Sequence, residues 1–202
     1  AEGLNAELGG MKDVTFQTQL NTNLMATNMG ISGQEAASLT GNFARLNGNS
    51  TSIAADMAAS TKALAKSKGV MPSAVMKDVA KSSKAFAEYG KDGGANIAEA
   101  AVAAARLGVN MDSLTKVTDH LLDFESSITD ELELGAMLGR NINLNKARQL
   151  AYEGKIGASV KEALGQMGGV DAYNKMDIFQ KRQAAKALGL SVEELDKVVK
   201  NQ

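Results

Sequence analysis

The feature that most constrains the fold of this chain is a glycine turn that occurs four times between stretches of helical character. The turns are centred on Gly30, Gly69, Gly108 and Gly189. An aliphatic residue follows each glycine, and Ser or Asn comes next in three of the four copies: Ile31-Ser32, Val70-Met71, Val109-Asn110 and Leu190-Ser191. Glycine closes a helix in the left-handed conformation without a Cβ penalty, and Ser or Asn caps the helix that follows. The pattern predicts helices joined directly by tight turns.

The spacing of these turns is nearly regular. The steps from 30 to 69 and from 69 to 108 are both 39 residues, and the step from 108 to 189 is 81. A period near forty matches the size of a two-helix unit in helical arrays. Two interpretations stay open: an internal duplication, or a common helix linker that recurs by chance. Both predict helix–turn–helix units.

The composition favours an all-α fold. The chain has a single proline, and runs of alternating β-branched residues bounded by turns are absent. The twenty glycines lie mostly where helices are expected to end. With no cysteine, the chain has no disulfide framework and no thiolate or Cys-based metal site. We therefore expect an array of short helices and helical hairpins joined by Gly-capped turns, with almost no strand.

The periodic pattern predicts about ten helices with approximate bounds. They are expected near 12–29, 33–46, 51–68, 72–89, 94–107, 111–138, 143–153, 158–167, 175–188 and 191–200. Capping boxes are expected at Ser32 with Glu35 and at Ser191 with Glu194, and Pro72 fits a first helical residue. The polar stretch Lys91–Gly94 indicates a boundary between an N-terminal helical region, 1–92, and a C-terminal one, 93–202. One continuous domain is the alternative.

The longest expected helix, 111–138, carries the clearest apolar stripe. Its members recur at steps of three and four residues: Leu114, Val117, Leu121, Phe124, Ile128 and Leu132. Such a stripe predicts one packing seam on a single amphipathic helix near 111–138. The seam could dock on neighbouring helices of the same chain or on other copies, and the sequence leaves both open.

Charge is divided unevenly along a chain whose net charge is −1. Residues 62–91 hold seven lysines against two acids, and residues 112–133 hold seven acids against one lysine. This division could let two halves or two subunits attract one another, or it could reflect solvated helix faces. The lysine stretch lacks the aromatics and arginines of a nucleic-acid site, so we expect no nucleic-acid contact.

No pattern of catalytic or ligand-binding residues is recognisable. His120 is the only histidine and has no ligand cluster around it. Glu131 and Glu133, two residues apart, project from different helix faces. Phosphate-binding glycine loops and a Gly-x-Ser-x-Gly elbow are absent. We predict a protein that is not an enzyme, with no catalytic, cofactor or metal residues, no cofactor and no small-molecule substrate.

The C-terminal half carries a long, ordered set of motifs. They are Leu121–Ile128, Glu131–Glu133, Leu138–Arg140, Asn143–Arg148, Asn174–Gln180, Ala184–Ser191 and Glu194-Leu195. Together they resemble a segment of the tail tape-measure proteins of tailed bacteriophages. The resemblance extends from about Ala104 to Val199 and is loose over residues 1–103. It transfers no catalytic residue.

The resemblance implies a virion structural role. Tape-measure proteins lie in the tail lumen, set tail length during assembly and leave the tube when the genome is delivered. It implies self-association, contact with tail tube, baseplate or chaperone proteins, and membrane contact only during infection. Such proteins are much longer than this chain, and together with the missing initiator Met this leads us to expect a segment of a larger polypeptide. An extended helix of this length would reach about 300 Å, so turns imply a compact domain instead.

Two other functions stay open at this point. One is an α-helical adaptor that binds a partner helix along an apolar groove. The other is a module associated with an envelope-acting peptidoglycan hydrolase, which requires a carboxylate with a raised pKa in a cleft.

Overall fold

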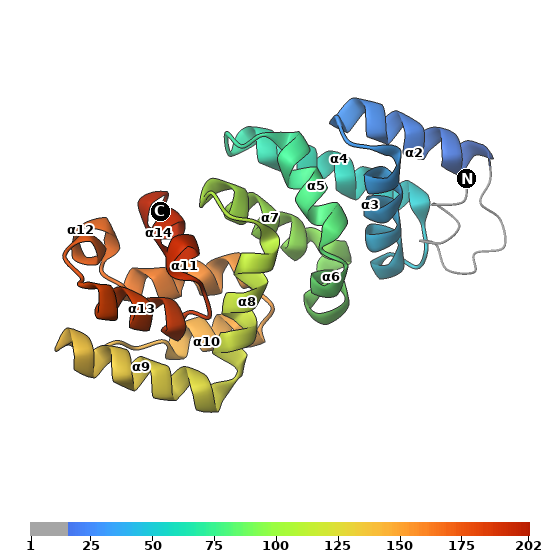
Figure 1. The fold of residues 1–202 in the computed structure, drawn as a ribbon. Coiled ribbons are helices and arrows are strands. Elements are labelled where there is room, and N and C mark those ends of the chain that lie inside the picture. The colour runs from blue at the N-terminus through green and yellow to red at the C-terminus, as the bar shows by residue number, and fades with distance from the viewer. Residues whose placement is uncertain (1–15) are drawn as a thin grey trace. The chain divides into compact units, whose positions relative to one another are not determined.

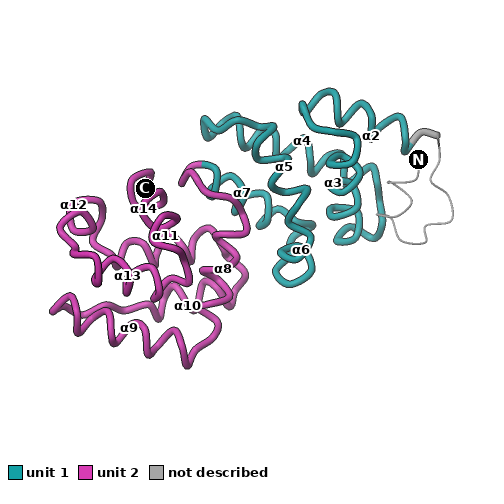
Figure 2. Tube along the Cα trace, in the orientation of Figure 1, with its two compact units in different colours: residues 1–105 teal, residues 106–202 magenta. Residues whose placement is uncertain are grey.

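The protein is all-α in the residues that the computed structural model describes, 16–202 (Figure 1). No strand occurs in this range. The first expected helix was placed at 12–29, and its opening residues lie outside the described part of the chain. The chain forms two compact units, residues 1–105 and residues 106–202 (Figure 2).

The first unit is built from helices that mostly match the expected ranges. In chain order they are α2 (Phe16–Met29), α3 (Gly33–Leu46), α4 (Thr51–Ser67), α5 (Pro72–Lys81), α6 (Ser83–Tyr89), the 3₁₀ turn η1 (Asp92–Gly94) and α7 (Ala95–Arg106). The polar stretch expected to separate two regions forms η1, which packs on α3 within this unit. The division between the units lies at residues 105 and 106.

The second unit contains shorter helices. They are α8 (Met111–Leu122), α9 (Phe124–Leu138), α10 (Asn145–Tyr152), α11 (Ile156–Gln166), α12 (Gly169–Asn174), α13 (Ile178–Ala187) and α14 (Val192–Lys200). The short α12 was not expected, because its Gly168-Gly169 start was interpreted as a break.

Side-chain caps begin several helices where the sequence predicts them. The Ser32 hydroxyl accepts from the Glu35 N–H at 3.1 Å, and Glu35 Oε2 accepts from the Ser32 N–H at 2.8 Å. Ser191 and Glu194 form the same reciprocal pair at 3.1 and 2.9 Å. Both capping boxes are therefore confirmed, and Pro72 opens α5. These contacts satisfy backbone donors that a helix start leaves free.

The helix expected over 72–89 is two helices, because the chain breaks at Ser82. Ser82 has a ψ of 35° and ends α5. The buried amide of Asn42 donates to the carbonyls of Val79 and Ala80 at 3.4 and 3.3 Å, and the Ser83 hydroxyl donates to Asn42 Oδ1 at 3.1 Å. A side chain from α3 thus binds carbonyls that the end of α5 exposes. This contact lies 37 residues away in sequence, so local periodicity could not indicate it.

The prediction of a single long helix over 111–138 is also wrong. Asp123, with a ψ of 82°, separates α8 from α9. Its Oδ2 accepts from the Ser126 hydroxyl at 2.7 Å, a local bond that competes with a continuous helix. The Ser126 hydroxyl and backbone bonds also hold the pKa of Asp123 below its ordinary value. The break redirects the chain, so α9 presents a different face to the core than a straight continuation would.

Each unit has its own core. In the first, α3 packs against α2, α4 and α5, and Phe43 meets Phe86 edge to face with centroids 5.1 Å apart. In the second, α8 packs against α9, α10 and α11, and α13 runs beside α9. Its fully buried aliphatic side chains include Leu114, Leu121, Leu134, Leu144 and Leu164.

Candidate functional site

The four turn glycines all have the left-handed backbone that their pattern predicts. Their φ angles are +66°, +72°, +72° and +63° for Gly30, Gly69, Gly108 and Gly189. After three of them, the next N–H donates to the carbonyl five residues earlier: Ile31 to Ala26, Val70 to Ala65 and Leu190 to Ala185, at 2.9–3.1 Å. This is the Schellman arrangement, which caps the exposed carbonyls of the ending helix. The glycines are structural elements of the turns.

Three further turns of the same kind were missed. At Gly48, with a φ angle of +62°, the N–H of Asn49 donates to the carbonyl of Ala44 at 2.8 Å. Gly139 and Gly154 have φ angles of +63° and +73°, and the N–H groups of Arg140 and Lys155 donate to carbonyls five residues earlier. In all three a polar or basic residue follows the glycine, so the Gly–aliphatic pattern did not find them. A search for glycine at the end of each apolar periodic stretch, whatever follows it, would have done so.

The predicted packing seam is divided by the break at Asp123. Leu114, Val117 and Leu121 on α8 are buried at 1% exposure or less. Phe124, Ile128 and Leu132 on α9 are 52%, 46% and 68% exposed. The prediction of one continuous seam is therefore wrong. The first half of the stripe is buried in the core, and the second half faces solvent. We call the second half, Phe124, Ile128 and Leu132, the α9 ridge.

The core-facing side of α9 is formed by residues that do not belong to the predicted seam. Ser127, Asp130 and Leu134 are buried at 4% exposure or less, and their spacing of three and four residues puts them on one helix face. The α9 ridge has a spacing of four, so its side chains also share one face, displaced from the buried one. Large apolar side chains gathered on one exposed helix face are typical of an interaction surface.

An ion cluster around the buried Asp130 carboxylate holds the core side of α9 against α13 and α8. Asp130 Oδ1 accepts from Lys186 Nζ at 2.8 Å, and Asp130 Oδ2 lies 3.3 Å from His120 Nε2. Lys186 also pairs with Glu133 at 3.2 Å. Hydrogen bonding to Asp130, with a further bond to Glu133, raises the pKa of Lys186. The cluster thus neutralises a carboxylate that would otherwise be costly to bury.

A second cluster ties α9 to α10. The buried Arg148 donates from Nε to Ser127 Oγ at 3.0 Å and from Nη1 to Asn145 Oδ1 at 2.9 Å. Its Nη2 forms an ion pair with Glu131, whose side chain is also largely buried. Arginine suits this role because its planar group donates in several directions at once. Together the two clusters fix the orientation of α9, and with it the direction in which the α9 ridge points.

A third cluster attaches the last helix to α8. The Ser113 hydroxyl donates to Glu194 Oε1 at 2.7 Å, and Lys116 lies 3.8 Å from the same oxygen. Burial raises the pKa of Glu194, but hydrogen bonds from Ser191 and Ser113 outweigh it and leave the pKa below its ordinary value. The carboxylate therefore acts here as a fixed acceptor between helices.

These arrangements are suited to holding helices and presenting a surface. His120, the one candidate for acid–base chemistry in the sequence, lies against Asp130, with its Nε2 3.3 Å from Oδ2. Among residues 16–202, no group of three metal-ligating side chains lies close enough to hold a metal ion. In the same range no helix combines the length and the apolar character of a membrane-spanning segment.

Comparisons with family models, with curated proteins and with solved structures return no match to this chain.

Proposed function

We propose that this chain is a segment of a tail tape-measure protein of a tailed bacteriophage, a virion structural protein that acts by helix packing. Its role would be in tail-length determination, tail assembly and genome delivery, and its place would be the tail lumen. The sequence resemblance over residues 104–199 supports this proposal, and the α9 ridge lies inside that range. A structural protein of an assembly needs a surface for its neighbours, and the ridge offers one.

The observation that carries the proposal is the exposure of the α9 ridge on a helix whose opposite face is fixed. The ridge consists of three large apolar side chains, one helical turn apart on the same face of α9. Their exposure to water costs free energy, about 25 cal/mol per Å² of apolar surface. Asp130 and Arg148 hold α9 so that these side chains cannot turn inward. Partners that cover the ridge would be other copies or tail tube, baseplate or chaperone proteins.

The test is electron microscopy of particles whose protein contains this segment with a gold-binding tag. The proposal predicts label inside the tail tube of full particles and its loss from the tube after genome ejection. As a control, the same tag on a capsid protein should label heads only. Label restricted to the head, or absent from particles altogether, would contradict the proposal.

A further inference from the structure

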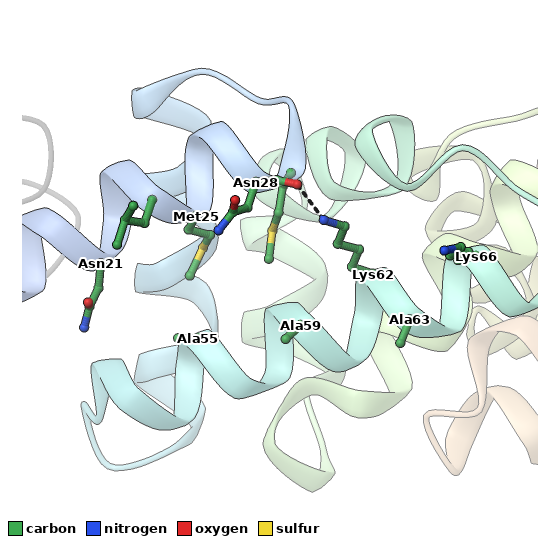
Figure 3. A pocket seen from close by; sticks show the side chains of 10 residues that line it. Asn21, Met25, Asn28, Ala55, Ala59, Lys62, Ala63 and Lys66 are labelled. Atoms are coloured by element: carbon green, nitrogen blue, oxygen red, sulfur yellow. Dashed lines mark hydrogen bonds between the residues drawn. The ribbon is translucent and has the colours of Figure 1, made fainter.

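The first unit contains an apolar groove between α2 and α4. Both helices pack on α3, and side chains of both line the groove between them (Figure 3). Its volume is about 600 Å³. The α2 wall is formed by Leu24, which is 51% exposed, with the sulfur-bearing side chains of Met25 and Met29 below it. The α4 wall is a row of alanines, Ala55, Ala59 and Ala63. A shallow row of small side chains next to an exposed leucine leaves room for larger side chains from outside.

One end of this groove is basic. Lys62 reaches across from α4 and donates to the carbonyl oxygen of Asn28 at 2.5 Å, close to the end of α2 (Figure 3). Lys66 lies one turn further along α4 and also lines the groove. The other end, near Asn21 and Ala55, carries no charge among its lining residues. A partner helix therefore meets positive charge at one end only.

The α9 ridge matches the groove in spacing and in size. Its three large side chains and the three alanines both recur every fourth residue, so each row extends about 12 Å along its helix axis. Rows at this spacing interdigitate when helices pack, with large side chains of one helix over small ones of the other. We propose that the α2–α4 groove of one copy receives the α9 ridge of a second copy of this chain.

Charge selects the direction of the docked helix. Asp123 and Glu125, both exposed, lie at the N-terminal end of the ridge. At its other end, Glu133 is already paired with Lys186 and Gln183 of its own copy. Placing the acidic end against Lys62 and Lys66 puts Phe124 over Ala63 and Leu132 over Ala55. The ridge of one copy thus runs antiparallel to α4 of the other.

The contact is between two different surfaces, so it joins copies head to tail. Each copy keeps one groove and one ridge for the next, which gives a closed ring or an open chain of copies. The inference rests on the proposed function only in taking the ridge as an assembly surface. The inference is tested by the self-association of the purified chain, and the proposed function is tested by the labelling of tails. Either test can therefore fail while the other succeeds.

The experiment uses sedimentation velocity of the purified chain over a wide range of concentrations. Ala59→Trp fills the groove, and Leu132→Ser removes the most exposed side chain of the ridge; each should weaken self-association about tenfold or more. Ser60→Trp, beside the groove on α4, and Met137→Ser, away from the ridge on α9, are the matched controls and should associate like the original chain. Circular dichroism confirms that every variant keeps its helices.

Mixing the two defective variants gives the decisive result. The Ala59→Trp copy still has a working ridge and the Leu132→Ser copy a working groove, so the mixture should form one-to-one dimers and nothing larger. As a second readout, Lys66→Glu and Glu125→Lys should each weaken association, and the chain carrying both should recover it. An original chain that stays monomeric at all concentrations overturns the inference. So does association that survives Ala59→Trp while Leu132→Ser abolishes it, which would indicate ridge-to-ridge pairing.

Discussion

Gly189 has two separate reasons to be glycine. Its φ of +63° belongs to the left-handed region, and a Cβ there would lie 2.7 Å from His120 Cβ and 3.1 Å from the Lys116 carbonyl oxygen. The turn before α14 is thus pressed against α8. Gly139 shares the φ value, but a Cβ there would meet nothing within 4 Å. A substitution at Gly139 therefore introduces backbone strain alone, whereas one at Gly189 introduces both backbone strain and a steric clash.

Replacing these glycines should therefore have unequal effects. Gly139→Ala is expected to lower the free energy of unfolding by about 1–2 kcal/mol, the cost of a left-handed alanine. Gly189→Ala should lower it by at least about 1 kcal/mol more, because α8 or the turn must move. Urea titration followed by circular dichroism measures both. Equal losses would show that the approach to His120 does not constrain the turn.

Glu194 should make stability depend on pH in a definite direction. Its folded pKa lies below that of the unfolded chain, so its contribution is complete above about pH 4.3 and is lost as the pH falls through the folded pKa. Glu194→Gln should cost about 1 kcal/mol at pH 7, and the difference should close in acid. Urea titrations at several pH values test this. The exposed neighbour Glu193→Gln is the control, and a difference that persists unchanged at pH 3 would contradict the assignment.

At this scale the sequence predicts much of the structure, because caps and turns are local chemistry. Ser32, Ser191 and Pro72 each occupy the helix-start position expected of them. Gly139 was missed because the residue after it is Arg140 and not an aliphatic one.

Local sequence patterns did not predict which face of helix α9 is buried. The apolar stripe places Phe124, Ile128 and Leu132 on one packing seam with the α8 residues, and leaves open whether the seam meets this chain or another copy. The structure buries Ser127 and Asp130 instead. Periodicity counts only the residues of one helix, whereas the burial of these polar groups depends on partners in other helices. The nearest such partner of Ser127 is 21 residues away, and the Lys186 that pairs with Asp130 belongs to α13.

Replacing Arg148 should destabilise the protein strongly, although this residue lies on the short helix α10. Arg148→Met leaves the Glu131 carboxylate largely buried without its cation, and the free energy of unfolding should fall by about 3–5 kcal/mol. Lys146→Met, two residues earlier on α10, breaks only the exposed pair with Glu162 and should cost at most about 1 kcal/mol.

A double variant checks the physical reason for this loss. Adding Glu131→Gln to Arg148→Met removes the unpaired charge and should recover part of the stability. Chemical denaturation of all four chains gives the coupling directly. A double variant as unstable as the sum of the single ones would show that the pair is not coupled.

At the scale of the whole molecule, the turns decide how far the chain can reach. Residues 106–202 would span about 145 Å as one continuous helix. In the structure they fold into seven helices, α8 to α14, that form one compact unit. The all-α class followed from composition and periodicity, but the division at residues 105 and 106 lies at the end of α7, and no composition change marks it.

Deleting residues 106–202 in a phage whose tape-measure protein contains this segment tests whether the turns persist in the tail. We expect tails shortened by clearly less than about 145 Å, because a folded unit spans less than its extended helix. Tail lengths in negative-stain micrographs provide the measurement. Shortening by the full extended length would show that the turns straighten, and unchanged tails would show that the unit does not contribute to length.

The central claim is that the outward face of α9 is covered by a second protein chain in the assembly, either another copy or a different tail protein. Its most direct test is a photo-crosslinking amino acid placed at Ile128 in the ridge, with Lys161 on the exposed side of α11 as the reference position. Ultraviolet illumination of assembled tails should give covalent adducts with a second protein chain from position 128 and far fewer from position 161. Equal yields at both positions, or no adduct at 128, would contradict the claim.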